Sequence, residues 1–459
     1  MRPKKLQTIL ALLISFALEE GPVHEVVFTR GAGAAARQKW AKAMKILYLL
    51  HDVPFPPSDG IRLKVYNVIE YMARDHECHV LAFGDPGARE RAVDFTSRVP
   101  GITVLDILPA RTGFPLLLSR VRRTALRLLP PSTARYESRG FARILREALR
   151  HGSYDVVHYD VVNMAQYVHL GTGTASVHSP NDATSLRYLR EAEEYRQPVT
   201  RMARLVSAGL LARFERTVYP RFTKIHVVSQ IEAEYLVALC KGIDVEVIAN
   251  AVDRQFLAFE PRMAPEQEGR APELLFTGSL AIPGIASGLL EFISLSYPGI
   301  LAAVPNVRFT ILGRSADPAV RRRLEGIPGV TVIPWVQDYV SAIASANVVV
   351  FPEKGGAGPK HRVLQAMSLG KAVVGSPDAF QGTRVQDGEN CFICRNPGDF
   401  VESISHLLID EGLQRRLGQS ARRLILSDHT MDTLGLRWVS LYQGAVEKFR
   451  HPADIKVRT

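Results

Sequence analysis

Cysteine is scarce in this chain of 459 residues, which has only four, at positions 78, 240, 391 and 394. So few thiols exclude the disulfide framework of a small secreted domain. Cys391 and Cys394 form a C-x-x-C pair. A zinc ribbon needs a second such pair, and a redox pair begins a helix, whereas this one lies in an alternating, strand-like run. We therefore expect the cysteines to be structural and predict no metal site.

Apolar runs long enough to span a bilayer are also missing. The longest terminal run, Leu6–Leu18, has 13 residues, whereas a membrane-spanning helix needs about 20. It follows Lys4 and Lys5 as a signal-peptide core would, but no clean small-residue cleavage site comes after it. A signal and a membrane anchor stay open. We favour a non-native or dispensable extension over residues 1–43, because Met44 begins a strand-like run with its own start methionine.

Acidic residues are the minority charge, with 46 Asp and Glu against 57 Lys and Arg and a net charge of +11. This balance indicates an anionic partner such as a nucleotide, a membrane surface or nucleic acid. Residues 116–129 place arginines opposite an apolar helical face, so one hypothesis is a basic helix resting on an anionic membrane. The alternative is an ordinary helix packed on its own core. No aromatic stacking platform accompanies these charges, which disfavours nucleic acid.

Short apolar, β-rich runs alternate with helix-period segments along the chain, for example 46–50 and 156–159 in the first half and 307–312 and 348–351 in the second. Continuous apolar strands separated by helices predict an α/β protein with doubly wound parallel sheets. The length exceeds that of one ordinary core. We predict two Rossmann-like domains facing each other across a cleft, which binds ligands at the carboxyl ends of the strands. The predicted boundaries are 44–259 for the first domain, 260–272 for a Pro- and charge-rich linker and 273–430 for the second domain.

The most informative stretch is 351–376, FPEKGGAGPKHRVLQAMSLGKAVVGS. Its composition predicts a strand, a glycine-rich loop, a basic helix start and a second strand. Gly356 and Gly358 permit close approach of backbone amides to a phosphate, and the helix dipole favours an anion there. Lys360 and Arg362 add positive charge at the same place. The stretch therefore predicts a nucleotide-type ligand.

Three weaker signals in the second half predict residues at the same cleft. Gly278 lies in a small turn that closes a strand, Arg314 follows the strand glycine Gly313, and Trp335 follows another strand. We expect Gly278 to expose backbone amides, Arg314 to reach a phosphate and Trp335 to form a wall for a nucleobase.

Two signals in the first half point to the other side of the cleft. The loop 51–60 is rich in proline and ends in Asp59 and Gly60, so we expect it to cover a ligand, although a plain strand–helix connection is the alternative. His178 ends an apolar strand, where it can contact a phosphate or sugar hydroxyl as a catalytic residue or orient an acceptor. The alternative is a histidine satisfied locally beside Asp182. His158 we interpret as structural.

The chain resembles family-4 glycosyltransferases of the GT-B fold over most of residues 44–450. It looks most like the branch of bacterial polysaccharide sugar transferases, whose motif maps here to Pro352, Gly358, Arg362 and residues 364–367. The resemblance rests on MKILYLLHDVPFPPSDG, DVVHYD, SVHSPNDATSLRYLR, VVSQIEAEYL, VIANAVD, LLFTGSL, FTILGR, GVTVIPWVQDYVSAIASANVVVFP and VLQAMSLGKAVVGSPDAFQGTRVQDGENCF.

The resemblance implies a nucleoside-diphosphate sugar donor held mainly by the second domain, and transfer with retention of configuration, without a metal or other cofactor. It implies a saccharide or lipid-linked acceptor, and a place in the cytoplasm or on the inner face of the cell membrane. It also implies that a helix over 431–450 crosses back to the first domain.

The chain departs from the family pattern at two positions. The family has two glutamates eight positions apart, where this chain has Ala357 and Gln365. Gln365 can still hydrogen-bond a ribose hydroxyl, although a neutral acceptor is weaker than a carboxylate. We therefore expect a retaining glycosyltransferase. The alternative is a catalytically degenerate nucleotide-sugar-binding protein that acts with a partner enzyme, and a GT-B epimerase is a remote third.

Overall fold

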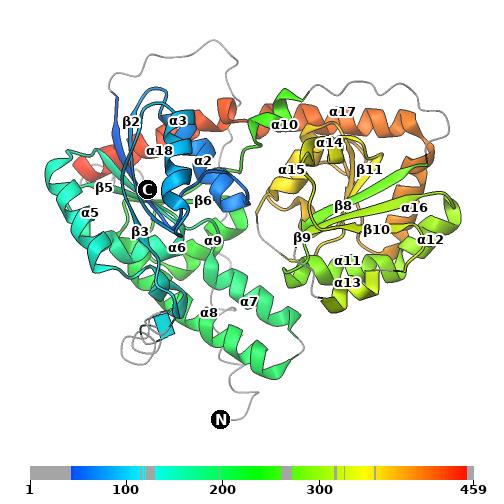
Figure 1. The fold of residues 1–459 in the computed structure, drawn as a ribbon, viewed down its shortest axis with the longest axis horizontal. Helices are drawn as coiled ribbons and strands as arrows, with labels where there is room; N and C mark the ends of the chain where they lie inside the picture. The colour runs from blue at the N-terminus through cyan, green and yellow to red at the C-terminus, as the bar shows by residue number, and fades with distance from the viewer. Residues whose placement is uncertain are drawn as a thin grey trace.

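Two parallel sheets, of seven and six strands, organise the chain into two lobes (Figure 1). The computed structural model describes residues 43–113, 116–117, 119, 130–195, 197–259, 271–314, 318–324, 326–355 and 358–451. Both sheets have helices packed on them, so the predicted doubly wound α/β architecture is confirmed.

The first lobe has the strand order β3-β2-β1-β4-β5-β6-β7, with every pair parallel. Strands β4 and β5 are buried along their whole length, because helices cover both faces. The strands are β1 Lys45–Leu50, β2 Glu77–Gly84, β3 Ile102–Pro109, β4 Val156–Asp160, β5 Ala175–Ser179, β6 Lys224–Val227 and β7 Val245–Val247. The helices are α2 Gly60–Met72, α3 Ala88–Arg98, α5 Arg139–His151, α6 Val161–Met164, α7 Thr184–Glu194, α8 Pro198–Val218, α9 Gln230–Leu239 and α10 Arg254–Ala258.

The second lobe has the strand order β10-β9-β8-β11-β12-β13. Its strands are β8 Glu273–Ser279, β9 Arg308–Arg314, β10 Val330–Ile333, β11 Val348–Phe351, β12 Ala372–Gly375 and β13 Phe392–Ile393. Its helices are α11 Pro283–Leu295, α12 Tyr297–Ala303, α13 Pro318–Leu324, α14 Tyr339–Ala344, α15 His361–Ser368, α16 Pro397–Ile409 and α17 Glu411–Asp428. The strand order reverses between β1 and β4 in one sheet and between β8 and β11 in the other. Ligands of such sheets bind at these switch points, beyond the carboxyl ends of the strands.

Helix α18, Met431–Arg450, follows the second lobe in sequence but packs on the first sheet (Figure 1). Its apolar residues recur at helical spacing, so one stripe of the helix is buried. Leu434, Trp438, Leu441 and Tyr442 join the core that holds β1 and α2. The last helix therefore connects the second lobe to the core of the first.

In the described ranges, no single helix is long and apolar enough to cross a membrane, although the bent pair Gly284–Leu295 and Tyr297–Ala303 passes that test together. Leu289, Phe292 and Ile300 of this pair lie in the core of the second lobe. The predicted basic helix over 116–129 lies outside the described residues except for 116, 117 and 119, and the extension 1–43 lies outside except for residue 43. All four cysteines are free and buried.

Candidate functional site

The lobes meet through the segments that follow β6, β7 and β11 and through the starts of α2 and α15. Asn250 of the first lobe donates from Nδ2 to the Pro359 carbonyl of the second, at 3.0 Å. A Cβ on Gly60 would lie 3.0 Å from Cδ2 of His361, and a Cβ on Gly358 would lie 2.5 Å from Cγ2 of Val228. The glycines of both predicted loops therefore lie where the two lobes come closest.

Asp59 and Gly60 form the start of α2 at this contact. The Asp59 carboxylate caps the helix by accepting hydrogen bonds from the amides of Ile61 and Arg62, each at 3.0 Å. Gly60 follows and packs against His361, the first residue of α15. Burial lowers the pKa of His361 to about 4, so this imidazole is neutral at pH 7.

Replacing Gly60 by valine should hold the lobes apart, because the added side chain would overlap the His361 ring. We expect affinity for a nucleoside diphosphate to fall by about tenfold or more, since close packing resists added volume. Isothermal calorimetry and small-angle scattering would measure both effects. Gly173→Val is the matched control, because no atom lies within 4 Å of a Cβ there. Equal affinity in the Gly60 and Gly173 variants would contradict the prediction.

Arg362 lies at the switch point of the second sheet, where the structure brings it against Gly278. Its Nη1 donates to the Thr277 carbonyl at 2.7 Å, and its Nη2 donates to Glu353. A Cβ on Gly278 would lie 2.6 Å from Nη1, so only glycine leaves room for the guanidinium. Two residues predicted separately from sequence are therefore neighbours in the fold.

Lys360 brings a second positive charge to this point. Its Nζ donates to the carbonyls of Gly358 and Asp378, at 3.2 and 2.8 Å. Burial lowers the pKa of Lys360, and the charges of Arg362 and Arg190 lower it further while Glu353 opposes them. Arg190 lies on α7, which contacts α11 of the second lobe. Lys360 therefore feels positive charge from both lobes, and a bound anion would offset that charge.

The other predicted donor residues are less closely gathered. Gln365 lies one helical turn after Arg362 in α15 and is partly buried. Trp335 is 65% exposed after the edge strand β10, which β9 separates from β8. Arg314 ends β9 opposite Ser279, but its side chain lies outside the described part of the structure, as does Gly356.

His178, which the sequence predicts as a catalytic residue, has a buried side chain in this structure. The side chain is fully buried, and Nδ1 lies 3.0 Å from the Tyr159 carbonyl. The ring stacks on Phe222 with centroids 4.7 Å apart and an interplanar angle of 19°, and Tyr219 meets it edge-on. Burial lowers the pKa of His178 to about 3. In this structure the imidazole is therefore a neutral group packed among aromatic rings.

Sequence reasoning missed a polar cluster at the carboxyl ends of β1 and β4. The Lys64 ammonium lies 3.0 Å from Oδ1 of the fully buried Asp160 and donates to Ser179 Oγ at 2.8 Å. Nδ1 of His51 lies 3.5 Å from Oδ2 of Asp160. Although burial acts in the opposite direction, Lys64 holds the pKa of Asp160 well below its usual range.

Two further signs mark this cluster. Val161, directly after Asp160, has a φ of +54°, which β-branched residues rarely adopt. Lys64 interrupts the apolar pattern of α2 between Leu63 and Val65, which are buried with it. A lysine at a core-facing helical position was the signal in the sequence that could have located the cluster.

A buried carboxylate holds the first turn of α7, the helix that follows β5. Glu215 is fully buried and accepts hydrogen bonds from the Ser185 amide at 3.0 Å and from the Ser185 hydroxyl. Burial raises the pKa of Glu215 to about 7. This carboxyl therefore ionises in the folded protein only near neutral pH.

Replacing Glu215 by glutamine should change how stability depends on pH. Because the folded pKa is raised, the wild-type carboxyl costs stability as pH rises from about 4.5 to about 7, whereas glutamine does not titrate. We therefore expect Tm of Glu215→Gln minus Tm of wild type to increase between pH 5 and pH 8. Thermal melts across this range measure it, with the exposed Glu234→Gln as control. A constant difference would contradict the prediction.

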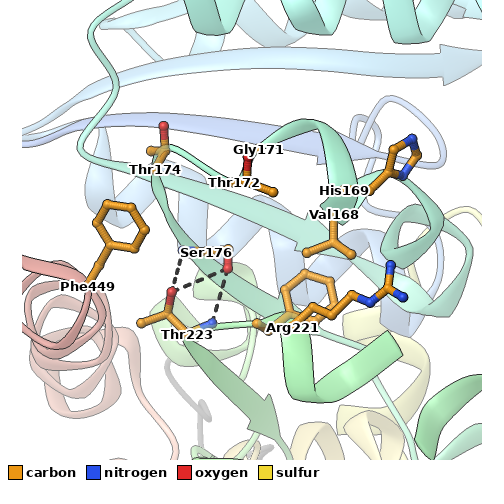
Figure 2. Close-up of a pocket in the computed structure, with 10 residues that line it drawn as sticks. Val168, His169, Gly171, Thr172, Thr174, Ser176, Arg221, Thr223 and Phe449 are labelled. Carbon is orange, nitrogen blue, oxygen red and sulfur yellow. Dashed lines mark hydrogen bonds between the residues drawn. The ribbon is translucent and has the colours of Figure 1, made fainter. Parts of the chain in front are cut away.

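A cavity of about 400 Å³ lies elsewhere, at the amino ends of β5 and β6 (Figure 2). Ser176 and Thr223 in its wall hydrogen-bond to each other, and Phe449 of α18 closes one side. This edge is opposite to the carboxyl ends of the same strands. The cavity is therefore separate from the contact between the lobes.

Both halves of the chain match families of glycosyltransferases. The family described as "Glycosyltransferase Family 4" matches residues 58–256, and the family described as "Glycosyl transferases group 1" matches residues 271–410. A curated relative, "Glycosyltransferase 1 domain-containing protein 1" of Xenopus tropicalis, is 25% identical over 133 residues, which are 28% of this chain. The chain spans 39% of that relative's length.

Solved structures agree in fold. Sucrose-phosphate synthase from Thermosynechococcus elongatus is 17% identical, with a TM-score of 0.59 over 87% of this chain and 98% of its own. Anabaena Alr3699/HepE in complex with UDP and glucose is 14% identical, with a TM-score of 0.59 over 87% of this chain and 99% of its own. A glycosyltransferase from Rickettsia africae is 11% identical, with a TM-score of 0.61 over 88% and 100%. The chain therefore belongs to glycosyltransferase family 4 and has the two-lobed GT-B architecture.

Proposed function

We propose that this glycosyltransferase moves a sugar, with retention of configuration, from a nucleoside-diphosphate sugar to a polysaccharide, glycolipid or glycoconjugate acceptor. The observation that carries the proposal is the group of cations at the start of α15. Lys360 and Arg362 lie at the β8–β11 switch point, and in this structure backbone carbonyls and Glu353 accept their hydrogen bonds. The UDP complexes of Alr3699/HepE, a structural neighbour, support the same donor class.

The chemistry asked of these residues is binding and charge stabilisation. A diphosphate would replace the carbonyls at Lys360 and approach the outer edge of Arg362, with the amino end of α15 favouring its negative charge. When the bond between the sugar and the diphosphate breaks, the same cations stabilise the leaving group. The acceptor oxygen forms the new bond to the anomeric carbon, and its proton leaves with the diphosphate. Gln365 is proposed to contact the ribose. We propose no metal and no cofactor besides the donor.

The acceptor side is proposed to lie in the first lobe. Asp59, Gly60 and the cluster of His51, Lys64 and Asp160 lie at the sheet edge that faces α15. The basic stretch 116–129 and the net charge of +11 support a lipid-linked acceptor at an anionic membrane surface. We place the reaction in the cytoplasm, on the inner face of the cell membrane.

A catalytically degenerate nucleotide-sugar-binding protein is the second candidate, because Ala357 and Gln365 provide no carboxylate. Uridine, guanosine and thymidine diphosphate sugars would be tested for binding by thermal shift and for turnover by donor hydrolysis and transfer. Binding together with turnover supports the enzyme. Binding without turnover, together with activity created by Gln365→Glu, supports the degenerate protein. Absence of binding by every donor contradicts both.

A further inference from the structure

We propose that Glu353 is a donor-binding residue, whose free carboxylate oxygen accepts a hydrogen bond from a hydroxyl of the nucleotide sugar. This inference rests on the proposed function and adds a specific contact to it. The shared chemistry is a neutral hydroxyl group, which belongs to the ribose or to the transferred sugar.

The first step is the position of Glu353. Glu353 is the second residue after β11, at the switch point, and is only 2% exposed. Its backbone carbonyl accepts a hydrogen bond from Ser376 Oγ at the end of β12. The next residue, Lys354, is exposed and pairs with Glu291 on α11. Glu353 therefore turns inward, where it meets Arg362, one of the predicted donor residues.

The second step is the difference in hydrogen bonding between the two carboxylate oxygens of Glu353. Oε2 accepts from Nη2 of Arg362. Oε1 is buried and has no hydrogen-bond partner among the residues that the structure describes. Burying a carboxylate oxygen without a donor is unfavourable, so this oxygen is an acceptor that a ligand hydroxyl could satisfy.

The third step decides which partner fits. Phosphate oxygens carry negative charge, so the Glu353 carboxylate would repel them. The Arg362 side chain is 14% exposed and that of Glu353 is 2% exposed, so Arg362 is the more accessible of the two. A diphosphate therefore belongs on Arg362, and a hydroxyl, which donates, belongs on Oε1. The arrangement places an acceptor for a hydroxyl directly beside the cation for the diphosphate.

The competing interpretation is that Glu353 acts only by positioning Arg362. Binding of three probes separates the two: inorganic pyrophosphate, the nucleoside diphosphate, and its glucose conjugate, all with the base that the wild type binds best. If Glu353→Gln lowers the affinity for the glucose conjugate alone, by about 10- to 100-fold, the hydroxyl belongs to the sugar. If the affinities for the diphosphate and the conjugate fall equally while that for pyrophosphate is unchanged, the hydroxyl belongs to the ribose.

If the affinity for all three probes falls equally, or the affinity for none of them changes, the inference is overturned while the proposed function stays intact. Absence of any nucleotide binding to the wild type overturns both. Glu291→Gln is the matched control, because it removes a neighbouring exposed ion pair and should change no affinity. If Glu353→Gln does not fold, as judged by circular dichroism, Glu353→Asp keeps the charge and withdraws the oxygen, and the same selective loss is expected.

Discussion

Arg362→Ala is expected to lower kcat/KM for transfer by about 100- to 1,000-fold, the usual cost of removing one donor to charge that develops in a transition state. The same change should lower the free energy of unfolding by roughly 3–5 kcal/mol, because it leaves the buried Glu353 carboxylate without its partner. Transfer assays and urea denaturation measure the two effects.

A second substitution separates the two effects of Arg362→Ala. In the double variant Arg362→Ala/Glu353→Gln no unpaired charge remains, so we expect most of the lost stability to return while transfer stays low. Arg395→Ala is the control, because its ion pair with Asp387 is 3.9 Å long and exposed, and it should change neither quantity. Recovery of transfer in the double variant would show that Arg362 serves folding rather than the donor.

The fold could be predicted from sequence because its strands are buried on both sides. A strand covered by helices on both faces is a continuous apolar run, and β4 and β11 both have this form. The switch points then placed Gly278 and Arg362 at one edge of a sheet. The hydrogen bond between Arg362 and the Thr277 carbonyl was not predictable, because these residues are 85 positions apart and no local pattern encodes which groups meet.

His178 shows what such reasoning leaves open. Period-two alternation sends neighbouring strand residues to opposite faces, so a shift of one residue decides which polar group reaches the buried ion pair. Ser179 receives a hydrogen bond from Lys64, while the ring of His178 enters an aromatic pocket with Phe222. The sequence pattern predicts where the strand ends but not to which face of the sheet each of its last two side chains points.

Lys64→Met is expected to lower the free energy of unfolding by about 3–5 kcal/mol, because Asp160 would remain buried and charged without its ammonium partner. The sign of the pH dependence follows from the depressed pKa of Asp160. The stability that the pair contributes is present above the unfolded value of about 3.9 and is lost as pH falls through the folded value. Urea denaturation at pH 7 measures the loss.

Two comparisons make the Lys64 experiment specific. Lys64→Met/Asp160→Asn removes both charges and should recover much of the stability, since an apolar and a neutral side chain leave no buried ion. Lys45→Met breaks an ion pair with Glu77 whose side chains are 27% and 54% exposed, and should cost under about 1 kcal/mol. A loss for Lys64→Met as small as that for Lys45→Met would mean that water solvates Asp160. In that case His51 and Asp160 would lie in a hydrated part of the cleft rather than on a rigid polar support beneath it.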